Sequence, residues 1–221
     1  MAFLNAVIKR TGKVRIEPVE ILEDRDLLAE TAGEKAGKLD VLARLADGAK
    51  VDIEVQLHNQ YNMERRSLDY WARHYTKGIE AGQDYSLLSA VICINILDFG
   101  YMPLEDFHTS FHIYEDRRKE HMLTDALELH FLDMVKFRKL SEKDIQHDPL
   151  HRWLVYFDKH SSINLIEEVL CMDPAIRKMQ EKIEWIQGNP DLFRAYLRYE
   201  KAASDEVTRI NGCGKRGCRR D

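Results

Sequence analysis

Two stretches of residues 38–57 alternate between apolar and polar positions, with a short polar turn between them. The apolar positions are Leu39, Val41, Ala43 and Leu45 in the first stretch and Val51, Ile53, Val55 and Leu57 in the second. Because successive side chains of a strand point to opposite faces of a sheet, this pattern predicts a β-hairpin. Its apolar face turns toward a core, and the other face carries Asp40, Glu54 and Gln56.

The length of the turn decides whether Asp40 and Glu54 meet. A two-residue loop, Asp47-Gly48, would place Asp40 opposite Val55 and separate the two acids. A three-residue loop, 46–48, with Gly48 in the left-handed conformation, places Asp40 opposite Glu54. It also keeps both apolar sets on one face, and burial of such a face specifies strand register strongly. We therefore predict the three-residue loop.

Residues 61–82 have the period of an amphipathic helix. One face is predicted to be apolar and to contain Tyr61, Leu68, Trp71, Ala72, Tyr75 and Ile79. The other face gathers Arg66, Tyr70, Arg73, His74 and Lys77. This second face has two interpretations: a basic stripe that binds phosphates, or a solvated face balanced by nearby acids.

Further strands are predicted downstream. Residues 86–97 form a nearly continuous apolar run, typical of a central strand buried on both faces. Residues 107–115 and 126–135 alternate, with His108 and His112 expected at the surface. From about residue 140 the pattern is helical, and Asp173 before a proline is typical of a helix start. The order predicts an α/β fold with a mixed sheet, flanking helices and a C-terminal helical extension.

Composition narrows the function classes. The chain has 221 residues and a net charge of −5, so DNA affinity would come from local basic patches. No run of about eighteen apolar residues is present, which argues against a membrane span. The start is too short and mixed for a secretory signal, so a cytoplasmic location is the default expectation.

Two carboxylates on directly paired strand positions repel each other unless a cation lies between them. Mg²⁺ suits such a pair, because it binds one or two carboxylates and completes its shell with water and substrate phosphate. Acids on the solvent face of a strand are also ordinary, so the spacing alone leaves both interpretations open. An adjacent basic helix favours the first, since a phosphodiester nuclease needs cations for the DNA backbone and acids for a metal.

The hairpin and the following helix, RRSLDYWARHY, resemble the PD-(D/E)XK nuclease fold, and more narrowly the recombination-promoting nuclease (Rpn) family of transposase-like proteins. The resemblance covers roughly residues 3–210. It continues in the same order through the blocks SLLSAVICINILDF, FHTSFHIYED, LTDALELHFLDMVKF and LFRAYLRYEKAASDEVTRI. It implies a restriction-endonuclease-like domain at 1–140, shortened at its N-terminus, and a helical extension at 141–210. Residues 211–221 do not resemble the family's tail, and their Lys and Arg content predicts a disordered basic tail.

The resemblance also implies a function: a metal-dependent DNA endonuclease of a transposase or recombination-promoting family. Asp40, Glu54 and Gln56 would be catalytic, and the two acids would bind Mg²⁺ or another divalent ion such as Mn²⁺ or Ca²⁺. DNA would be bound by Arg66, Tyr70, Arg73 and Lys77. Gln56 stands where the motif has lysine. The alternative is a catalytically inactive or truncated member that acts as a DNA-binding or interaction module. The exposed helix faces would also allow a homo-oligomer.

Overall fold

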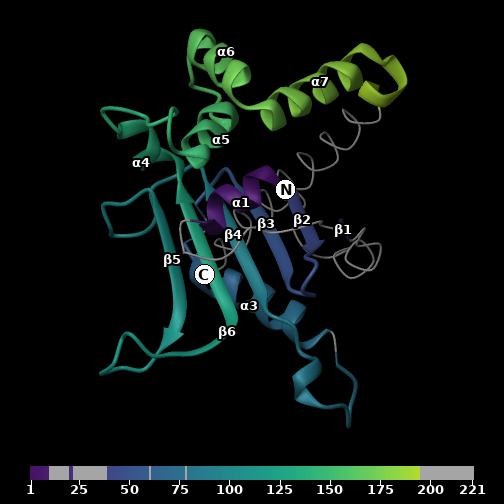
Figure 1. The fold of residues 1–221 in the computed structure, drawn as a ribbon, viewed down its shortest axis with the longest axis vertical. Coiled ribbons are helices and arrows are strands. Elements are labelled where there is room, and N and C mark those ends of the chain that lie inside the picture. Colours follow the sequence, from purple (N-terminus) through teal and green to yellow (C-terminus); the bar gives the residue numbers. More distant parts are fainter. Residues whose placement is uncertain (10–19, 22–38, 60, 78, 195–221) are drawn as a thin grey trace, which may run out of the picture. The chain divides into compact units, whose positions relative to one another are not determined.

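The computed structural model describes residues 1–9, 20–21, 39–59, 61–77 and 79–194 (Figure 1). The helices are α1 (Ala2–Lys9), α3 (Met63–Thr76), the short 3₁₀ helix η1 (Tyr85–Leu87), α4 (Met134–Lys139), α5 (Pro149–Phe157), α6 (Ile163–Met172) and α7 (Pro174–Gly188). The strands are β1 (Glu20–Ile21), β2 (Leu39–Arg44), β3 (Lys50–Gln56), β4 (Val91–Leu97), β5 (His108–Tyr114) and β6 (Met122–Asp133). The predicted basic tail lies outside the described residues.

The strands form one mixed sheet in the order β1-β2-β3-β4-β6-β5. β2 and β3 are antiparallel, β3, β4 and β6 are parallel to one another, and β5 returns antiparallel to β6. All seven residues of β4 are buried, as expected for the central strand predicted within residues 86–97. The prediction of an α/β fold with a mixed sheet and flanking helices is confirmed.

The β2–β3 hairpin has the predicted register. Asp40 pairs with Glu54 across the two antiparallel strands. The loop is closed by the backbone N–H of Leu45, which donates to the carbonyl of Ala49 at 2.8 Å. Gly48 has φ +88°, the left-handed conformation that the three-residue loop requires. The predicted pairing of the two acidic positions is therefore confirmed for the backbone.

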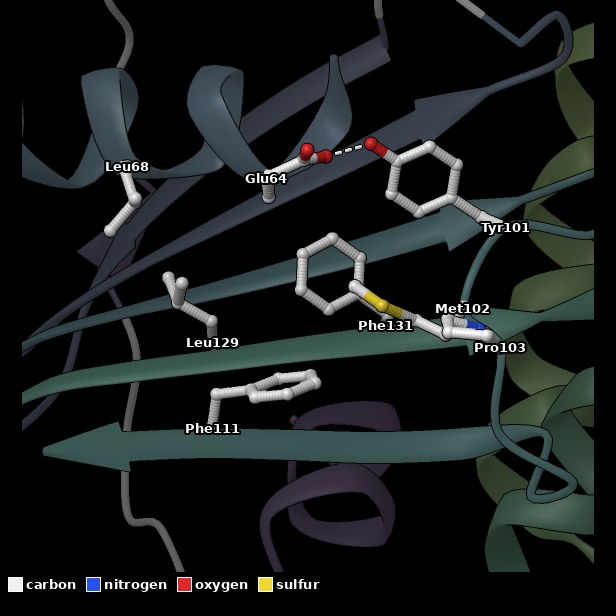
Figure 2. Close-up of a pocket in the computed structure, with 8 residues that line it drawn as sticks. All are labelled: Glu64, Leu68, Tyr101, Met102, Pro103, Phe111, Leu129 and Phe131. Carbon is white, nitrogen blue, oxygen red and sulfur yellow. Dashed lines mark hydrogen bonds between the residues drawn. The ribbon is translucent and has the colours of Figure 1, made fainter. Parts of the chain in front are cut away.

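Helices cover both faces of this sheet: α1 lies on one face and α3 on the other (Figures 1 and 2). α1 buries Val7 and Ile8 and also packs on α5, where the rings of Phe3 and Trp153 lie 5.9 Å apart. The polar face of the hairpin, opposite the face predicted to turn toward a core, is covered as well. Glu54 and Gln56 are buried beneath α3, because alternation reveals two faces but not which of them a helix will cover.

The apolar face predicted for the helix is also wrong in part. Leu68 is exposed, whereas the positions buried against the sheet are Met63, Ser67 and His74. The helix is shorter than predicted, since α3 ends at Thr76. The two polar residues can lie against the sheet because the strand face beneath them is polar as well, and buried polar groups need hydrogen-bond partners.

The described residues fall into two compact units. The first contains α1, the sheet and α3 to α5. The second contains α6 and α7, which pack on each other. The predicted helix start is confirmed, because the Asp173 carboxylate accepts hydrogen bonds from the backbone of Ala175 and Ile176. The domain limits at residues 140 and 210 stay predictions.

Candidate active site

Three polar side chains line one face of β3 at every second position: Asp52, Glu54 and Gln56. Their exposed fractions are 5%, 2% and 5%, although carboxylates are seldom buried in proteins. The register places Glu54 between Asp40 of β2 and Asn95 of β4, at the centre of the sheet. A buried charge in this position requires compensating partners.

Glu54 receives that compensation from two directions. Arg66 of α3 donates from Nη2 to Glu54 Oε1 at 2.6 Å. Gln56, on the same strand, donates from Nε2 to the same oxygen at 2.5 Å. Tyr70, one turn along α3, accepts from Arg66 Nη2 at 3.2 Å. The structure thus brings four predicted site residues, Glu54, Gln56, Arg66 and Tyr70, into one polar cluster.

Asp40 is the fifth predicted member of this site. The structure describes its backbone, which is paired with Glu54, but not its side chain. Directly opposite residues of an antiparallel pair have Cβ atoms about 4.5–5.5 Å apart. The backbone therefore brings the two acidic positions as close as the predicted metal site requires.

The residues predicted to bind DNA do not all lie on one exposed face of α3. Arg66 is turned into the cluster, with 13% of its side chain exposed. Arg73 is 56% exposed and pairs with Asp69 of the same helix at 2.9 Å. Lys77 is exposed at the C-cap of α3. Only Arg73 and Lys77 keep the open position that contact with a DNA backbone needs.

Sequence reasoning missed other polar residues around this cluster. His74, predicted on the basic face, is buried with its Nε2 3.8 Å from a carboxylate oxygen of Asp52. Ser67 donates to the side chain of Asn95 at 2.8 Å. Two signals could have found them: Asp52 continues the alternation of Glu54 and Gln56, and seven residues separate Ser67 from His74, which puts both on one helix face.

The charges of this region affect neighbouring groups. Burial raises the pKa of the Cys93 thiol, and the negative charges of Asp52 and Glu54 raise it further, so the thiol stays protonated and is no nucleophile. Burial, aided by the positive charges of Arg44 and Lys77, lowers the pKa of Lys50. The ammonium group of Lys50 donates to the backbone carbonyl of His74 at 2.5 Å and so fastens the end of α3 to β3.

The other side of α3 is chemically different, as Figure 2 shows. A hollow of about 560 Å³ lies there between the helix, β5 and β6. It is lined by Glu64, Leu68, Tyr101, Met102, Pro103, Phe111, Leu129 and Phe131. Its one carboxylate, on Glu64, accepts a hydrogen bond from the Tyr101 hydroxyl. This lining is mostly hydrocarbon, in contrast to the polar cluster around Glu54.

A comparison with family models agrees with this fold. The model described as PD-(D/E)XK nuclease family transposase matches residues 1–212. The chain belongs to this family. No curated protein and no solved structure matches it. Membership in the PD-(D/E)XK nuclease family transposases implies DNA as the class of substrate, and nucleases of this kind generally use divalent metal ions.

The donor set at the hairpin fits such an ion in chemical type. Two carboxylates from paired strand positions, with water and substrate phosphate, satisfy the preference of Mg²⁺ for oxygen. Among the described side chains, no group of three or more His, Cys, Asp or Glu residues could hold a metal ion. In the same part of the chain, no helix is long and apolar enough to cross a membrane.

Proposed function

We propose that this PD-(D/E)XK family member is a metal-dependent DNA endonuclease that hydrolyses phosphodiester bonds. The observation that carries this proposal is the pairing of Asp40 with Glu54 in the hairpin register, with Gln56 bonded to Glu54 on the same strand face. A family model for nucleases that spans nearly the whole chain supports it. The role of the family in transposition or recombination is part of the same proposal.

In this function Asp40 and Glu54 hold the divalent ion. When bound, such an ion lowers the pKa of a coordinated water and neutralises charge on the scissile phosphate. Gln56 keeps the Glu54 carboxylate in one orientation through its amide N–H. Arg73 and Lys77, on the exposed side of α3, bind backbone phosphates and place the duplex over the hairpin.

The covering helix has a role as well. Because α3 leaves Glu54 only 2% exposed, little water reaches the carboxylate except as ligand or reactant. Charges in a water-poor site interact more strongly than in bulk solvent. The low exposure of Glu54 therefore strengthens the attraction of its carboxylate for a cation that reaches it, and Arg66 competes with that cation for one of its oxygens.

The test is conversion of supercoiled plasmid to nicked and linear forms by the purified chain, with Mg²⁺, Mn²⁺ or Ca²⁺ and with a chelator. We expect cleavage that requires the metal and that disappears in Asp40→Asn, which keeps the size of the side chain and removes its charge. Cleavage by Asp40→Asn at the parental rate would refute the proposal. So would the absence of cleavage with every divalent ion.

A second candidate function is a catalytically inactive module that binds DNA or a partner. It is favoured by the neutral amide at position 56 and by the bond between Glu54 and Arg66, which occupies an oxygen that a metal could use. A chain of this kind would bind duplex DNA in a salt-dependent manner and would not cleave it. The plasmid experiment therefore separates the two candidates.

A further inference from the structure

The cation nearest the candidate active-site carboxylate comes from the helix and not from the strand. The PD-(D/E)XK motif has lysine at the position of Gln56, and an amide carries no charge. Arg66 Nη2 instead lies 2.6 Å from Glu54 Oε1, the same oxygen that Gln56 binds. A positive charge is thus present within the cluster, but it is provided by α3.

The guanidinium of Arg66 is held in place by its neighbours. Tyr70 Oη accepts from Nη2 at 3.2 Å, and the Tyr70 ring lies 5.8 Å below the guanidinium carbon, within the range of a cation–π contact. Arg73, two turns away on the same helix, is exposed. Among the contacts that the structure describes, its side chain is bonded to Asp69 of α3 and to no residue of the sheet. Arg66 is therefore preorganised beside Glu54, unlike Arg73.

The chemistry of arginine limits what Arg66 can do there. Its guanidinium stays protonated at any pH relevant to catalysis, so it accepts no proton from the attacking water. It binds carboxylates and phosphates through a planar fork of N–H donors. These properties suit the stabilisation of negative charge and the positioning of a carboxylate.

We propose that Arg66 is the cation of this active site: it orients Glu54 and presents its guanidinium to the scissile phosphate, in place of a lysine at position 56. This inference rests on the proposed endonuclease function. During hydrolysis the oxygen of water bonds to phosphorus, the bond to the leaving oxygen breaks, and that oxygen takes up one proton of the water. Arg66 transfers no proton and stabilises the charge that collects on the non-bridging oxygens.

The kinetic test compares Arg66→Gln, Arg66→Lys and the double variant Arg66→Gln with Gln56→Lys, using a duplex substrate. We expect Arg66→Gln to lower kcat by about a hundredfold and to change KM by less than about threefold, as for loss of a group that acts on the transition state. Arg66→Lys retains the charge and should lose less than about tenfold. Lysine at position 56 should recover at least about tenfold of the loss in the double variant, which a purely structural role would not allow.

Arg65→Gln, at an exposed position of the same helix to which no role is assigned, is the matched control and should leave kcat and KM unchanged. Arg73→Gln removes a contact to the DNA backbone, so it should raise KM and reduce the slope of log affinity against log salt by about 0.9. If Arg66→Gln gives this same result, or if its kcat equals that of the parent, the proposal for Arg66 is overturned. If Arg66→Gln does not fold, as judged by circular dichroism, Arg66→Lys decides: a folded Arg66→Lys whose kcat falls by more than about tenfold counts against the proposal, because the charge is retained.

Calorimetric titration with Mn²⁺ alone provides a readout that needs no cleavage. Removal of a positive charge beside Glu54 should strengthen binding of Mn²⁺ to Arg66→Gln by at least about threefold relative to the parent. If the parent and Arg66→Gln cleave equally well, the proposed role of Arg66 is overturned and the proposed endonuclease function is not. A parent that never cleaves overturns the proposed function, and the titration then decides on Arg66. If Arg66→Gln binds Mn²⁺ no more tightly than the parent, or if neither protein binds Mn²⁺, the proposed role of Arg66 is contradicted.

Discussion

Two glutamates lie buried in the same sheet, on opposite faces. Glu54 of β3 pairs in register with Asn95 of β4, and Glu128 of β6 pairs with Ile92. Residues 92 and 95 are an odd number of positions apart, so the two glutamates point to different faces. Their exposed fractions, 2% and 0%, are almost equal. Burial of a carboxylate therefore does not distinguish a reactive site from a structural one.

The partners make the distinction. Glu128 contacts histidines of the sheet: His130 at 2.9 Å and His112 at 3.7 Å, while His108 lies 2.9 Å from the other ring nitrogen of His130. These contacts join β5 to β6. Glu54 instead contacts a permanently charged arginine from a helix and belongs to the hairpin proposed to hold the metal. The first network holds strands together, and the second suits binding of metal and phosphate.

The largest effect is expected at the hairpin. Asp40→Ala and Glu54→Ala should each abolish divalent-metal-dependent cleavage, because each removes a ligand that Mg²⁺ needs. Both variants should remain folded, as followed by far-ultraviolet circular dichroism. Plasmid cleavage by either folded variant at the rate of the parent would show that the site has been misassigned.

The histidine network should matter for stability and not for cleavage. His130→Ala removes the bonds to His108 and Glu128 and leaves a buried carboxylate with fewer partners, so we expect a loss of about 3 kcal/mol in the free energy of unfolding. Urea denaturation measures this loss, and His121→Ala, at an exposed turn, is the control. A strong loss of cleavage in a folded His130→Ala would show that the histidine network of Glu128 takes part in cleavage, contrary to the structural role assigned to it.

Arg73 and Lys77 should contribute to DNA binding only. With both changed to alanine, the slope of log affinity against log salt should fall by roughly 1.8, about 0.9 for each lost contact. Fluorescence anisotropy with a labelled duplex at several salt concentrations measures it, and Lys159→Ala, on another part of the same unit, is the control. An unchanged slope would mean that both residues belong to a solvated helix face.

The smallest effect concerns Asp98, at the end of β4. Burial raises the pKa of this carboxyl, but hydrogen bonds from Arg138 and Lys159 outweigh it and lower the pKa below its usual 3.8. The pairing stabilises the fold above about pH 4 and is lost as the pH falls below that value. Arg138→Met should therefore cost about 1–2 kcal/mol at pH 7 and less at pH 3, as measured by thermal unfolding. Equal costs at both pH values would contradict this assignment.

Much of the fold could be predicted because it depends on local rules. Alternation located β2, β3, β5 and β6, and the position of Gly48 with the apolar pattern gave the register that pairs Asp40 with Glu54. The burial of the polar face of the hairpin beneath α3 could not be predicted in this way. The polar face of a helix and the polar face of a strand each look exposed when they are considered alone, and they are buried here because they satisfy each other.

The same limit explains the histidines. His108 and His112 are predicted at the surface but are half-buried, because His108 contacts the buried His130 and His112 contacts the buried Glu128. The residues of β6 that satisfy them are about twenty positions away along the chain. Pattern within one strand identifies the shared face but gives no information on the neighbour that pairs with it.

Titration with Mn²⁺ followed by calorimetry tests most directly whether the hairpin carboxylates form a metal site. The proteins to compare are the parent, Asp40→Asn, Glu54→Gln and Glu128→Gln. We predict that the parent and Glu128→Gln bind Mn²⁺ with equal affinity, and that Asp40→Asn and Glu54→Gln lose at least about tenfold in affinity. Equal binding by Glu54→Gln and the parent, or no binding by the parent, would contradict it.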